Sequence, residues 1–197
     1  MGDTTGIVSV PSSEANKAFA ALTSGFIADP VMRWIYPEAH SYIESFPKLL
    51  RVLAGTAFED GTAYAAHDYS GAALWLSPGK TGDEEGALNV IEETVRSEIR
   101  DDLYTMLAEM DTYHPDDAPC WYLPFIGVDV SRQGRGLGSA LMQHALERCD
   151  KDGVQAYLES SNPANISLYE RHGFQVMGRI DAGSAPPIHP MLRPARG

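Results

Sequence analysis

Three glycines within five residues, Gly134, Gly136 and Gly138, lie between an apolar stretch and a helical pattern. Because glycine has no side chain, glycines at a helix start leave the backbone accessible to a ligand. The unpaired N–H groups of the first turn, together with the positive end of the helix dipole, can then bind a phosphate. Arg132 and Arg135 flank the glycines, so they form a local anion site in a chain of net charge −12. Backbone donors and charge-assisted bonds from two arginines suit a pyrophosphate.

Two other phosphate-binding motifs do not fit this segment. The dinucleotide pattern G-x-G-x-x-G fails because its third glycine position holds Ser139 or Leu141, depending on which glycine starts it. The P-loop pattern fails because no Gly-Lys-Ser/Thr follows the glycines.

The residues on either side of the glycines predict a strand before them and a helix after them. Residues 120–130 are apolar and rich in aromatic and branched side chains, which is typical of a central strand. Pro124 lies inside this stretch, and because proline cannot donate to a sheet ladder it marks an edge or a break in the pairing. Residues 136–150 predict a helix, which Gly153 closes.

The next predicted helix carries an amide and a phenol on one face. It covers residues 164–172, with Asn162 as its N-cap and Gly173 at its end. Asn165 and Tyr169 are four residues apart on this helix, so both side chains can face the same ligand.

The rest of the chain predicts strands and helices that together give a mixed α/β sheet. The expected strands are residues 6–10, 62–67, 72–76, 154–158, 174–180 and 188–192. The expected helices are a segment that opens at residues 11–13 and runs to Phe26, residues 41–53, and the acidic stretch 83–113. The side chains expected to face inward on these helices are Ala15, Ala18, Phe19, Leu22, Phe26, Ile43, Phe46, Leu50, Leu53, Ile91, Val95, Ile99, Leu103, Met106 and Met110.

Composition and charge narrow the classes of protein to which this chain can belong. With 197 residues, 44% of them hydrophobic, we expect one compact domain over residues 1–197. No apolar stretch is long enough to span a bilayer and the start lacks a secretory pattern, so we expect no membrane partner and a cytoplasmic location. The negative charge would repel a phosphate backbone, which argues against nucleic acid as a partner. Cys120 and Cys149 lack the spacing of a disulfide framework or a zinc site, so we expect no metal.

The glycine segment and the later helix together resemble a known superfamily. Gln133-x-x-Gly136-x-Gly138 is similar to the Q/R-x-x-G-x-G/A signature of the GNAT acyltransferases, which bind the pyrophosphate of acyl-coenzyme A there. Residues 165–174 are similar to a second block of that superfamily. Within it, residues 118–176 most resemble the puromycin N-acetyltransferases and their actinobacterial relatives, although Val130 departs from the proline common there.

The resemblance implies a fold and a co-substrate. The GNAT fold is a mixed, mostly antiparallel twisted sheet that splays at the central strand and carries helices on both faces. It would place a cofactor-binding core at about residues 118–180 and acceptor-side elements at about residues 11–115. Acetyl-coenzyme A (acetyl-CoA) is then the expected co-substrate, with its pantetheine arm along the splayed strand. The residues expected to bind it are Ile126, Val128, Val130, Gln133, Gly134, Arg135, Gly136, Gly138, Ser139 and Asn165.

The resemblance also implies catalytic roles. By analogy Tyr169 is the general acid that protonates the departing thiolate, since a phenol is protonated at neutral pH. A base must take a proton from the attacking ammonium, and we expect Glu159 first, His114 second and Asp129 third.

The predicted activity is transfer of acetyl to a primary amine of a small molecule, by direct attack in a ternary complex. Two alternatives stay open: a catalytically silent acyl-CoA-binding regulatory module, and an acetyltransferase for protein or peptide amino groups. A homodimer is compatible with the sequence.

Overall fold

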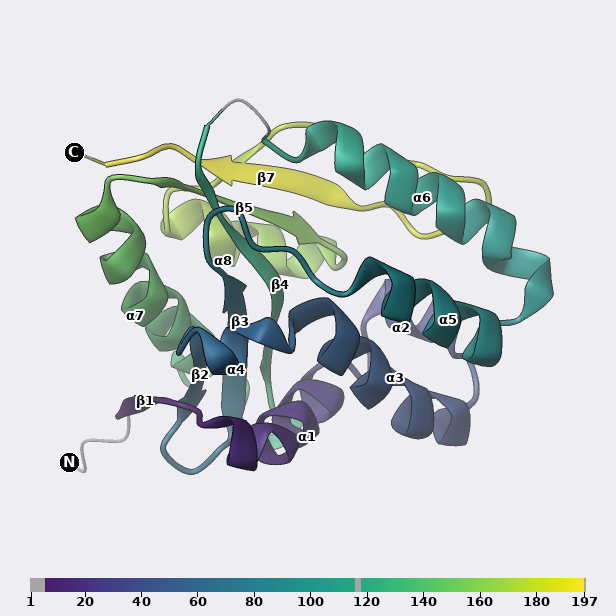
Figure 1. Ribbon diagram of the computed structural model, residues 1–197, viewed down its shortest axis with the longest axis horizontal. Coiled ribbons are helices and arrows are strands. Elements are labelled where there is room, and N and C mark those ends of the chain that lie inside the picture. Colours follow the sequence, from purple (N-terminus) through teal and green to yellow (C-terminus); the bar gives the residue numbers. More distant parts are fainter. Residues whose placement is uncertain (1–5, 116–117, 197) are drawn as a thin grey trace.

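The computed structural model describes residues 6–115 and 118–196, and a seven-stranded sheet forms its centre (Figure 1). The strand order is β1-β2-β3-β4-β5-β7-β6, and all neighbouring strands are antiparallel except β4 and β5. The strands are β1 (Ile7–Ser9), β2 (Ala63–Ala66), β3 (Gly71–Leu76), β4 (Cys120–Val128), β5 (Gln155–Ser160), β6 (Gln175–Val176) and β7 (His189–Arg193). The predicted mixed, mostly antiparallel sheet is therefore confirmed.

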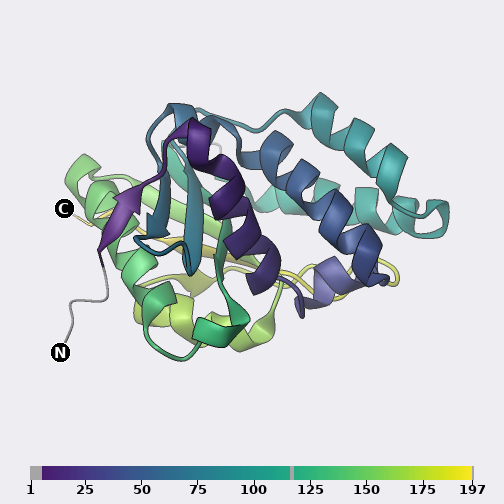
Figure 2. The ribbon, with the colours of Figure 1, turned by 90° about the horizontal axis from the view of Figure 1, so that it is seen from below.

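Helices cover both faces of the sheet (Figure 2). Successive side chains of a strand point to opposite faces, so Trp75 of β3 packs in the core beneath α7 and α8, while Leu74 and Leu76 pack in the core beneath α1 and α3. The helices are α1 (Ala15–Gly25), α2 (Pro30–Ile35), α3 (Ala39–Ala54), α4 (Thr56–Glu59), α5 (Glu84–Thr94), α6 (Arg100–Tyr113), α7 (Leu137–Asp152) and α8 (Ile166–Arg171).

Two predicted elements differ from the structure in extent. The acidic stretch 83–113 forms α5 and α6 rather than a continuous helix, because Val95 takes an extended conformation at the end of α5. Its predicted inner face is nevertheless buried as far as Met106. Residues 174–180 form only the short strand β6 and an isolated bridge between Ile180 and Ile188.

The inward face of α3 differs from the prediction at Ile43, whose side chain is 56% exposed. The buried stripe of α3 instead runs through Tyr42, Phe46, Leu49 and Leu50. Tyr42 and Phe46 are four residues apart and stack with their ring centroids 5.3 Å from each other. Because Tyr42 and Phe46 face the core and adjacent residues lie about 100° apart around a helix, Ile43 faces solvent.

The sheet opens between β4 and β5, as the position of Pro124 predicted. The two strands pair only from Cys120 to Tyr122 on β4 and from Gln155 to Tyr157 on β5. From residue 123 onward the side of β4 that faces β5 has no strand partner within the described chain. Pro124 follows the last paired residue by two positions, so the strands separate where a ladder donor is missing.

The prediction that the strand extends to Val130 is wrong. The strand β4 ends at Val128, and Val130 starts a short 3₁₀ turn with 51% of its surface exposed. Asp129 causes the turn, because its carboxylate accepts hydrogen bonds from the backbone N–H and the hydroxyl of Ser131 at 2.8 and 2.5 Å.

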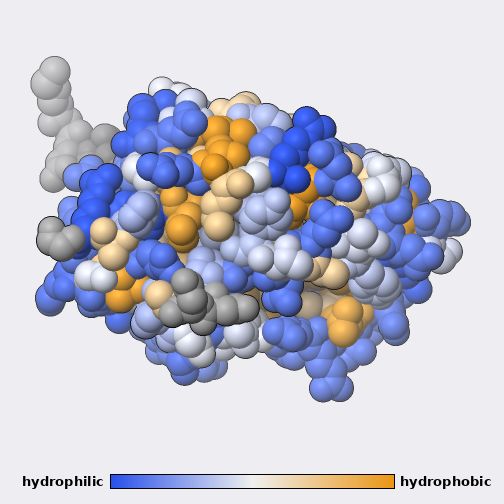
Figure 3. Space-filling model, turned by 90° about the horizontal axis from the view of Figure 1, so that it is seen from above, coloured by the Kyte–Doolittle hydropathy of each residue, from blue (hydrophilic) through white to orange (hydrophobic). Residues whose placement is uncertain are grey.

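The outer surface is largely hydrophilic on the face that carries α6 and β7, with apolar side chains in separate patches (Figure 3). Within residues 6–115 and 118–196, no helix is both long enough and apolar enough to cross a membrane.

Candidate active site

A cavity of about 490 Å³ opens where β4 leaves β5. Its walls come from the end of β4, the glycine-rich loop and first turn of α7, the helix α8, and the corner between α1 and α2. The predicted site residues that line it are Ile126, Val128, Val130, Gln133, Gly134, Gly136, Gly138, Ser139, Asn165 and Tyr169. The predicted residues Arg135 and Glu159 do not line it.

The start of α7 presents free backbone donors to this cavity. Gly136 is the N-cap with a left-handed φ of 82°, and Gly134 in the preceding loop has a φ of 73°. Glycine adopts this conformation without the strain that a Cβ would cause. No side chain caps the helix, so the N–H groups of Leu137, Gly138 and Ser139 in the first turn have no acceptor within the helix. An anion in the cavity would satisfy these donors.

The packing around Gly138 does not require the absence of a side chain. A Cβ built on it would lie 3.6 Å from Leu168 and 3.8 Å from Val128, which are ordinary van der Waals distances. Its backbone is not left-handed, and alanine would favour the helix by about 1 kcal/mol. The missing side chain leaves the backbone of the first turn open to the close approach of a ligand, and the site fits a pyrophosphate.

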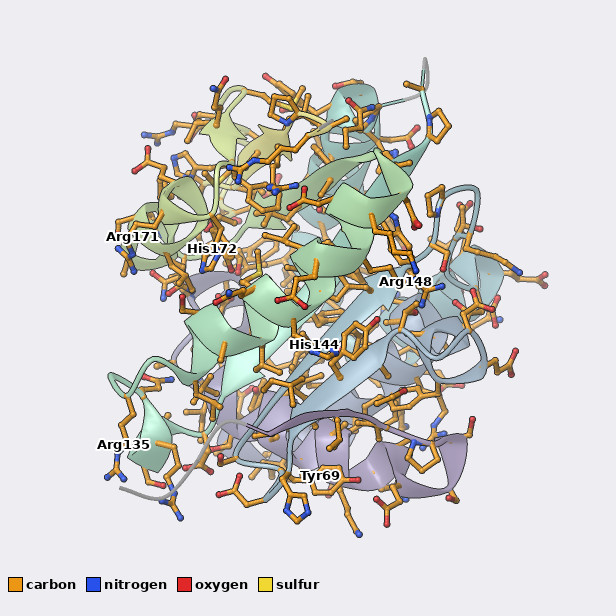
Figure 4. The ribbon with its side chains drawn as sticks, turned by 90° about the vertical axis from the view of Figure 1, so that its left-hand side faces the viewer. Tyr69, Arg135, His144, Arg148, Arg171 and His172 are labelled. Atoms are coloured by element: carbon orange, nitrogen blue, oxygen red, sulfur yellow. The ribbon has the colours of Figure 1, made fainter. Side chains whose placement is uncertain are left out.

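The arginines around the cavity are only partly those expected from the sequence. Arg132 lines the cavity, together with Arg171 from the last turn of α8. Arg135 lies at the outer tip of the loop, and its side chain points away from the protein body (Figure 4). Arg171 was not predicted as a binding residue, because its place beside the glycine loop depends on how α8 packs against α7.

Two polar side chains of the loop and α7 already have partners in the protein. The hydroxyl of Ser139 lies 2.8 Å from Nε2 of His172, at the end of α8. Burial, followed by the positive charges of Arg171, Arg193 and Arg196, lowers the pKa of His172, so the ring is neutral at neutral pH. The side-chain amide of Gln133 donates to the carbonyl of Val128 at 3.1 Å, which ties the loop to the end of β4.

Tyr169 of α8 and Asn165, the N-cap residue of α8, both line the cavity, as their spacing predicted. Tyr169 is only 6% exposed and packs against Phe174, with the ring centroids 6.3 Å apart. Burial, with a smaller effect from the carboxylate of Asp29, raises the pKa of the Tyr169 phenol above its ordinary value. The phenol therefore keeps its proton at neutral pH and can donate it.

Glu159 lies beside the cavity, where the strands begin to separate. It follows Tyr157, the last residue of β5 that pairs with β4, by two positions, and it pairs on the other side with Pro190 of β7. The hydroxyl of Tyr122 donates to its Oε2 at 2.8 Å, while the Tyr157 hydroxyl faces the same carboxyl group without hydrogen-bond geometry. Burial raises the pKa of Glu159 to about 7, although the nearby hydroxyls act in the opposite direction. A carboxylate with this pKa is suited to general base catalysis at neutral pH.

The structure groups the second candidate base with Glu159 and separates the third. The ring of His114 lies edge-on to Tyr122 and Tyr157, with centroids 5.2 and 5.1 Å apart. Asp129 instead accepts from Ser131 and, at 2.9 Å, from the hydroxyl of Ser24. These hydrogen bonds lower the pKa of Asp129, which makes it a weak base.

Asp29 is a cavity residue that the sequence analysis missed. It is the N-cap of α2, and it lines the cavity together with the glycine loop and α8. The pair Asp29-Pro30 is a recognisable helix start in the sequence. Nothing local shows that this start lies next to Tyr169, which is 140 positions later in the chain.

Comparisons with known proteins agree with this geometry. Residues 94–174 match the acetyltransferase (GNAT) family. An uncharacterised N-acetyltransferase of Schizosaccharomyces pombe is 26% identical over 84% of this chain and 72% of its own length.

Solved structures share the fold over nearly the whole chain. A Corynebacterium glutamicum protein described as histone acetyltransferase HPA2 and related acetyltransferase superposes with a TM-score of 0.68 at 23% identity, covering 97% of this chain and 96% of its own. The apo form of an agmatine N-acetyltransferase mutant also superposes with a TM-score of 0.68, at 16% identity, covering 96% of this chain and 99% of its own.

Residues 94–174 carry the match to the GNAT acetyltransferase family, and the protein is an acyltransferase of the N-acetyltransferase type. The narrower resemblance to puromycin N-acetyltransferases stays a prediction. Among the residues that the structure describes, no group of three or more His, Cys, Asp or Glu side chains is arranged to hold a metal ion.

Proposed function

We propose that this protein transfers the acetyl group of acetyl-CoA to a primary amine of a small molecule, by direct attack in a ternary complex. The observation that carries this proposal is the uncapped, glycine-rich start of α7, which opens into the same cavity as the buried phenol of Tyr169. An anion site and a proton donor in one cavity match a co-substrate that has a diphosphate at one end and a thioester at the other.

Different residues of the cavity would bind different parts of acetyl-CoA. The N–H groups at Gly138 and Ser139, with Arg132, would hold the pyrophosphate. The unpaired edge of β4 at Ile126 and Val128 offers backbone groups to the amide-rich pantetheine arm, in the manner of an added strand. Asn165, Gln133, Gly134 and Gly136 contribute the remaining cavity wall, and Val130 lies at its exposed edge.

Two groups of the protein would handle protons. Tyr169 donates its phenolic proton to the sulfur as the carbon–sulfur bond breaks. Glu159 is our candidate to take the proton from the amine nitrogen as the new carbon–nitrogen bond forms. Because Glu159 does not line the cavity, that proton would pass through an intervening group such as water or the hydroxyl of Tyr122. No covalent acyl-enzyme is needed.

Small amines are the acceptor class that the comparisons favour. One structural neighbour is described as an agmatine N-acetyltransferase, and another as a Drosophila melanogaster polyamine N-acetyltransferase that forms N-acetylagmatine. These descriptions concern those proteins, and they support an amine acceptor here without identifying it.

The test combines binding and turnover. Thermal unfolding is followed with and without acetyl-CoA, and thiol release from acetyl-CoA is followed with small amines, amino sugars, aminonucleosides and peptides. Because a ligand that binds only the folded state stabilises it, we expect a rise in the unfolding temperature, and thiol release with small amines but not with peptides. Stabilisation without thiol release would favour the regulatory module, and release with peptides would favour protein acetylation. No stabilisation by acetyl-CoA would remove the basis of the proposal.

A further inference from the structure

Asp29 is a buried carboxylate without a counter-ion in the described part of the chain. Two charged residues of the structure are fully buried, Asp29 at 6% exposure and Arg193 at 2%. Arg193 has its counter-ion, since its guanidinium lies 2.6 Å from a carboxylate oxygen of Asp150. No Lys, Arg or His side chain in the described residues lies within ion-pair distance of Asp29. A buried charge is normally paired, so a ligand with positive charge would complete this site.

The hydrogen bonds of Asp29 leave room for such a ligand. Its Oδ1 accepts from the backbone N–H groups of Val31 and Met32, both at 3.0 Å, and these bonds cap α2. Its Oδ2 accepts from the hydroxyl of Ser161 at 2.6 Å. A carboxylate oxygen can accept more than one hydrogen bond, so Oδ2 keeps capacity for a further donor. The contacts to α2 and to Ser161 fix the carboxylate in one orientation.

The cavity wall carries charged side chains of both signs. Arg132 and Arg171 line the cavity with the glycine loop, where the pyrophosphate is proposed. Asp29 contributes a carboxylate to the part of the wall that comes from the corner between α1 and α2, close enough to Tyr169 to raise the pKa of its phenol. Asp29 is the one carboxylate that lines the cavity in the described chain. The cavity thus offers positive charge to the diphosphate and negative charge next to the proton donor.

We infer that Asp29 is the residue that binds the ammonium group of the acceptor, so that the substrate is an amine that enters the cavity as a cation. Asp29 sets specificity and orients the amine. Glu159, the candidate base, takes one proton from the ammonium so that the nitrogen lone pair can attack, and the second proton lost from nitrogen replaces the one that Tyr169 gives to the sulfur. The assignment rests on the proposed function, since it names the acceptor class and the contact for the same cavity.

The test compares Asp29→Asn with Asp83→Asn. Asparagine is also a good N-cap, so Asp29→Asn keeps an oxygen for the N–H groups of Val31 and Met32 and removes the charge. It places an amide NH2 at Oδ2, to which the hydroxyl of Ser161 can turn as an acceptor. Asp83 is the matched control because its carboxylate caps α5, accepting from Gly86 at 2.8 Å, and does not line the active-site cavity. Acetyl transfer to agmatine, putrescine and phenethylamine is measured in both variants and in the unmodified protein, together with the Kd of acetyl-CoA.

For Asp29→Asn we expect KM for the amine to rise by roughly 10- to 100-fold, the effect of losing a hydrogen-bonded charge partner. The Kd of acetyl-CoA should stay within about twofold of its original value, and Asp83→Asn should change neither constant. Burial raises the pKa of Asp29, so its ionised form is less favourable in the folded protein. The unfolding temperature of Asp29→Asn at neutral pH should therefore stay equal or rise, whereas a purely structural role predicts a fall with an unchanged KM.

Other outcomes overturn the inference in distinct ways. An unchanged KM in Asp29→Asn, with turnover intact, rejects the Asp29 contact and leaves the proposed function standing. Stabilisation by acetyl-CoA without turnover of any of the three amines rejects a cationic amine as the acceptor. No stabilisation by acetyl-CoA rejects the proposed function itself.

Discussion

Burial changes the acid–base properties of the two residues proposed to move protons. Tyr169 is almost fully buried and its pKa is raised, so the phenol is protonated at neutral pH and can donate its proton to the departing sulfur. Burial also raises the pKa of Glu159, to about 7, so the same physical cause makes this carboxylate a stronger base. An acid and a base can therefore coexist on opposite sides of the splayed strands at neutral pH.

Removing the hydroxyl of Tyr169 should affect the chemical step more than binding. For Tyr169→Phe we expect kcat to fall by roughly 10- to 1000-fold, since a general acid is lost while the ring still fills its place. The Kd of acetyl-CoA should stay nearly the same. Steady-state kinetics and equilibrium binding test this, and unchanged turnover would exclude Tyr169 from the mechanism.

The pH dependence of the reaction should report Glu159. Below its pKa of about 7 the carboxyl is protonated and cannot accept a proton, so kcat should rise with pH through about 7. Glu159→Gln should lower kcat by roughly 100-fold or more and remove this dependence. Glu147→Gln, an exposed change on α7, is the control and should retain the full profile. A Glu159→Gln variant whose kcat still rises with pH near 7 would indicate that another group is the base.

The raised pKa of Glu159 also predicts the direction in which the stability of the protein changes with pH. A carboxyl whose folded pKa is raised stabilises the folded state while it is protonated, and this contribution is lost as pH rises from about 4.5 through about 7. Glu159→Gln should therefore gain stability relative to the unmodified protein above that range and lose this advantage in acid. Thermal unfolding across the pH range measures the difference.

At the scale of elements, the site depends on a helix start and on a gap in a sheet. The first turn of α7 supplies donors because Gly136 provides no side-chain cap. The gap between β4 and β5 exposes a strand edge because the pairing ends at Tyr122. The two features lie next to each other because a short loop joins the end of β4 to the start of α7.

Substitutions of Gly138 should separate helix stability from cofactor binding. Gly138→Ala should raise the free energy of unfolding by about 1 kcal/mol, because alanine favours a helix, and should weaken acetyl-CoA binding less than valine does. Gly138→Val places branched atoms where the ligand approaches, so we expect the Kd of acetyl-CoA to rise by roughly 10- to 100-fold. Denaturant unfolding and calorimetric titration test both changes. Equal affinity in the valine variant would show that nothing binds close to this backbone.

At the scale of the whole molecule, two cores on opposite faces of the sheet must be held in register. Arg193 of β7 anchors the helices of one face to the sheet, since its guanidinium pairs with Asp150 near the end of α7 and donates to the carbonyl of His172 at the end of α8 at 3.0 Å. One buried side chain thus ties the ends of both helices that frame the glycine loop to the sheet. It does not line the cavity.

Loss of Arg193 should destabilise the protein without changing its site. For Arg193→Met we expect a decrease of about 2 to 3 kcal/mol in the free energy of unfolding, because charge-assisted hydrogen bonds are lost and buried acceptors are left unpaired. Arg179→Met is the control, since the Arg179–Asp181 pair is exposed and should contribute nothing measurable. Urea unfolding measures both variants, and acetyl-CoA affinity should be unchanged in each.

Much of the fold and of the cofactor side of the cavity followed from the sequence. The glycines at 134, 136 and 138 and the spacing of Asn165 and Tyr169 are local features, and helix and strand geometry fixes where local neighbours point. Pro124 likewise indicated the break in β4, because a missing backbone donor has the same effect in any sheet.

Only the tertiary structure decided which distant side chains share the cavity. Asp29 and Arg171 line it, Arg135 points away, and Glu159 lies beside it with Tyr122 and His114 near it. These positions depend on how helices pack across a splayed sheet, so a side chain's own sequence neighbours carry no sign of them. The chain alone therefore predicted the helix start at which we propose that a diphosphate binds, and packing decided which charged side chains meet in the cavity.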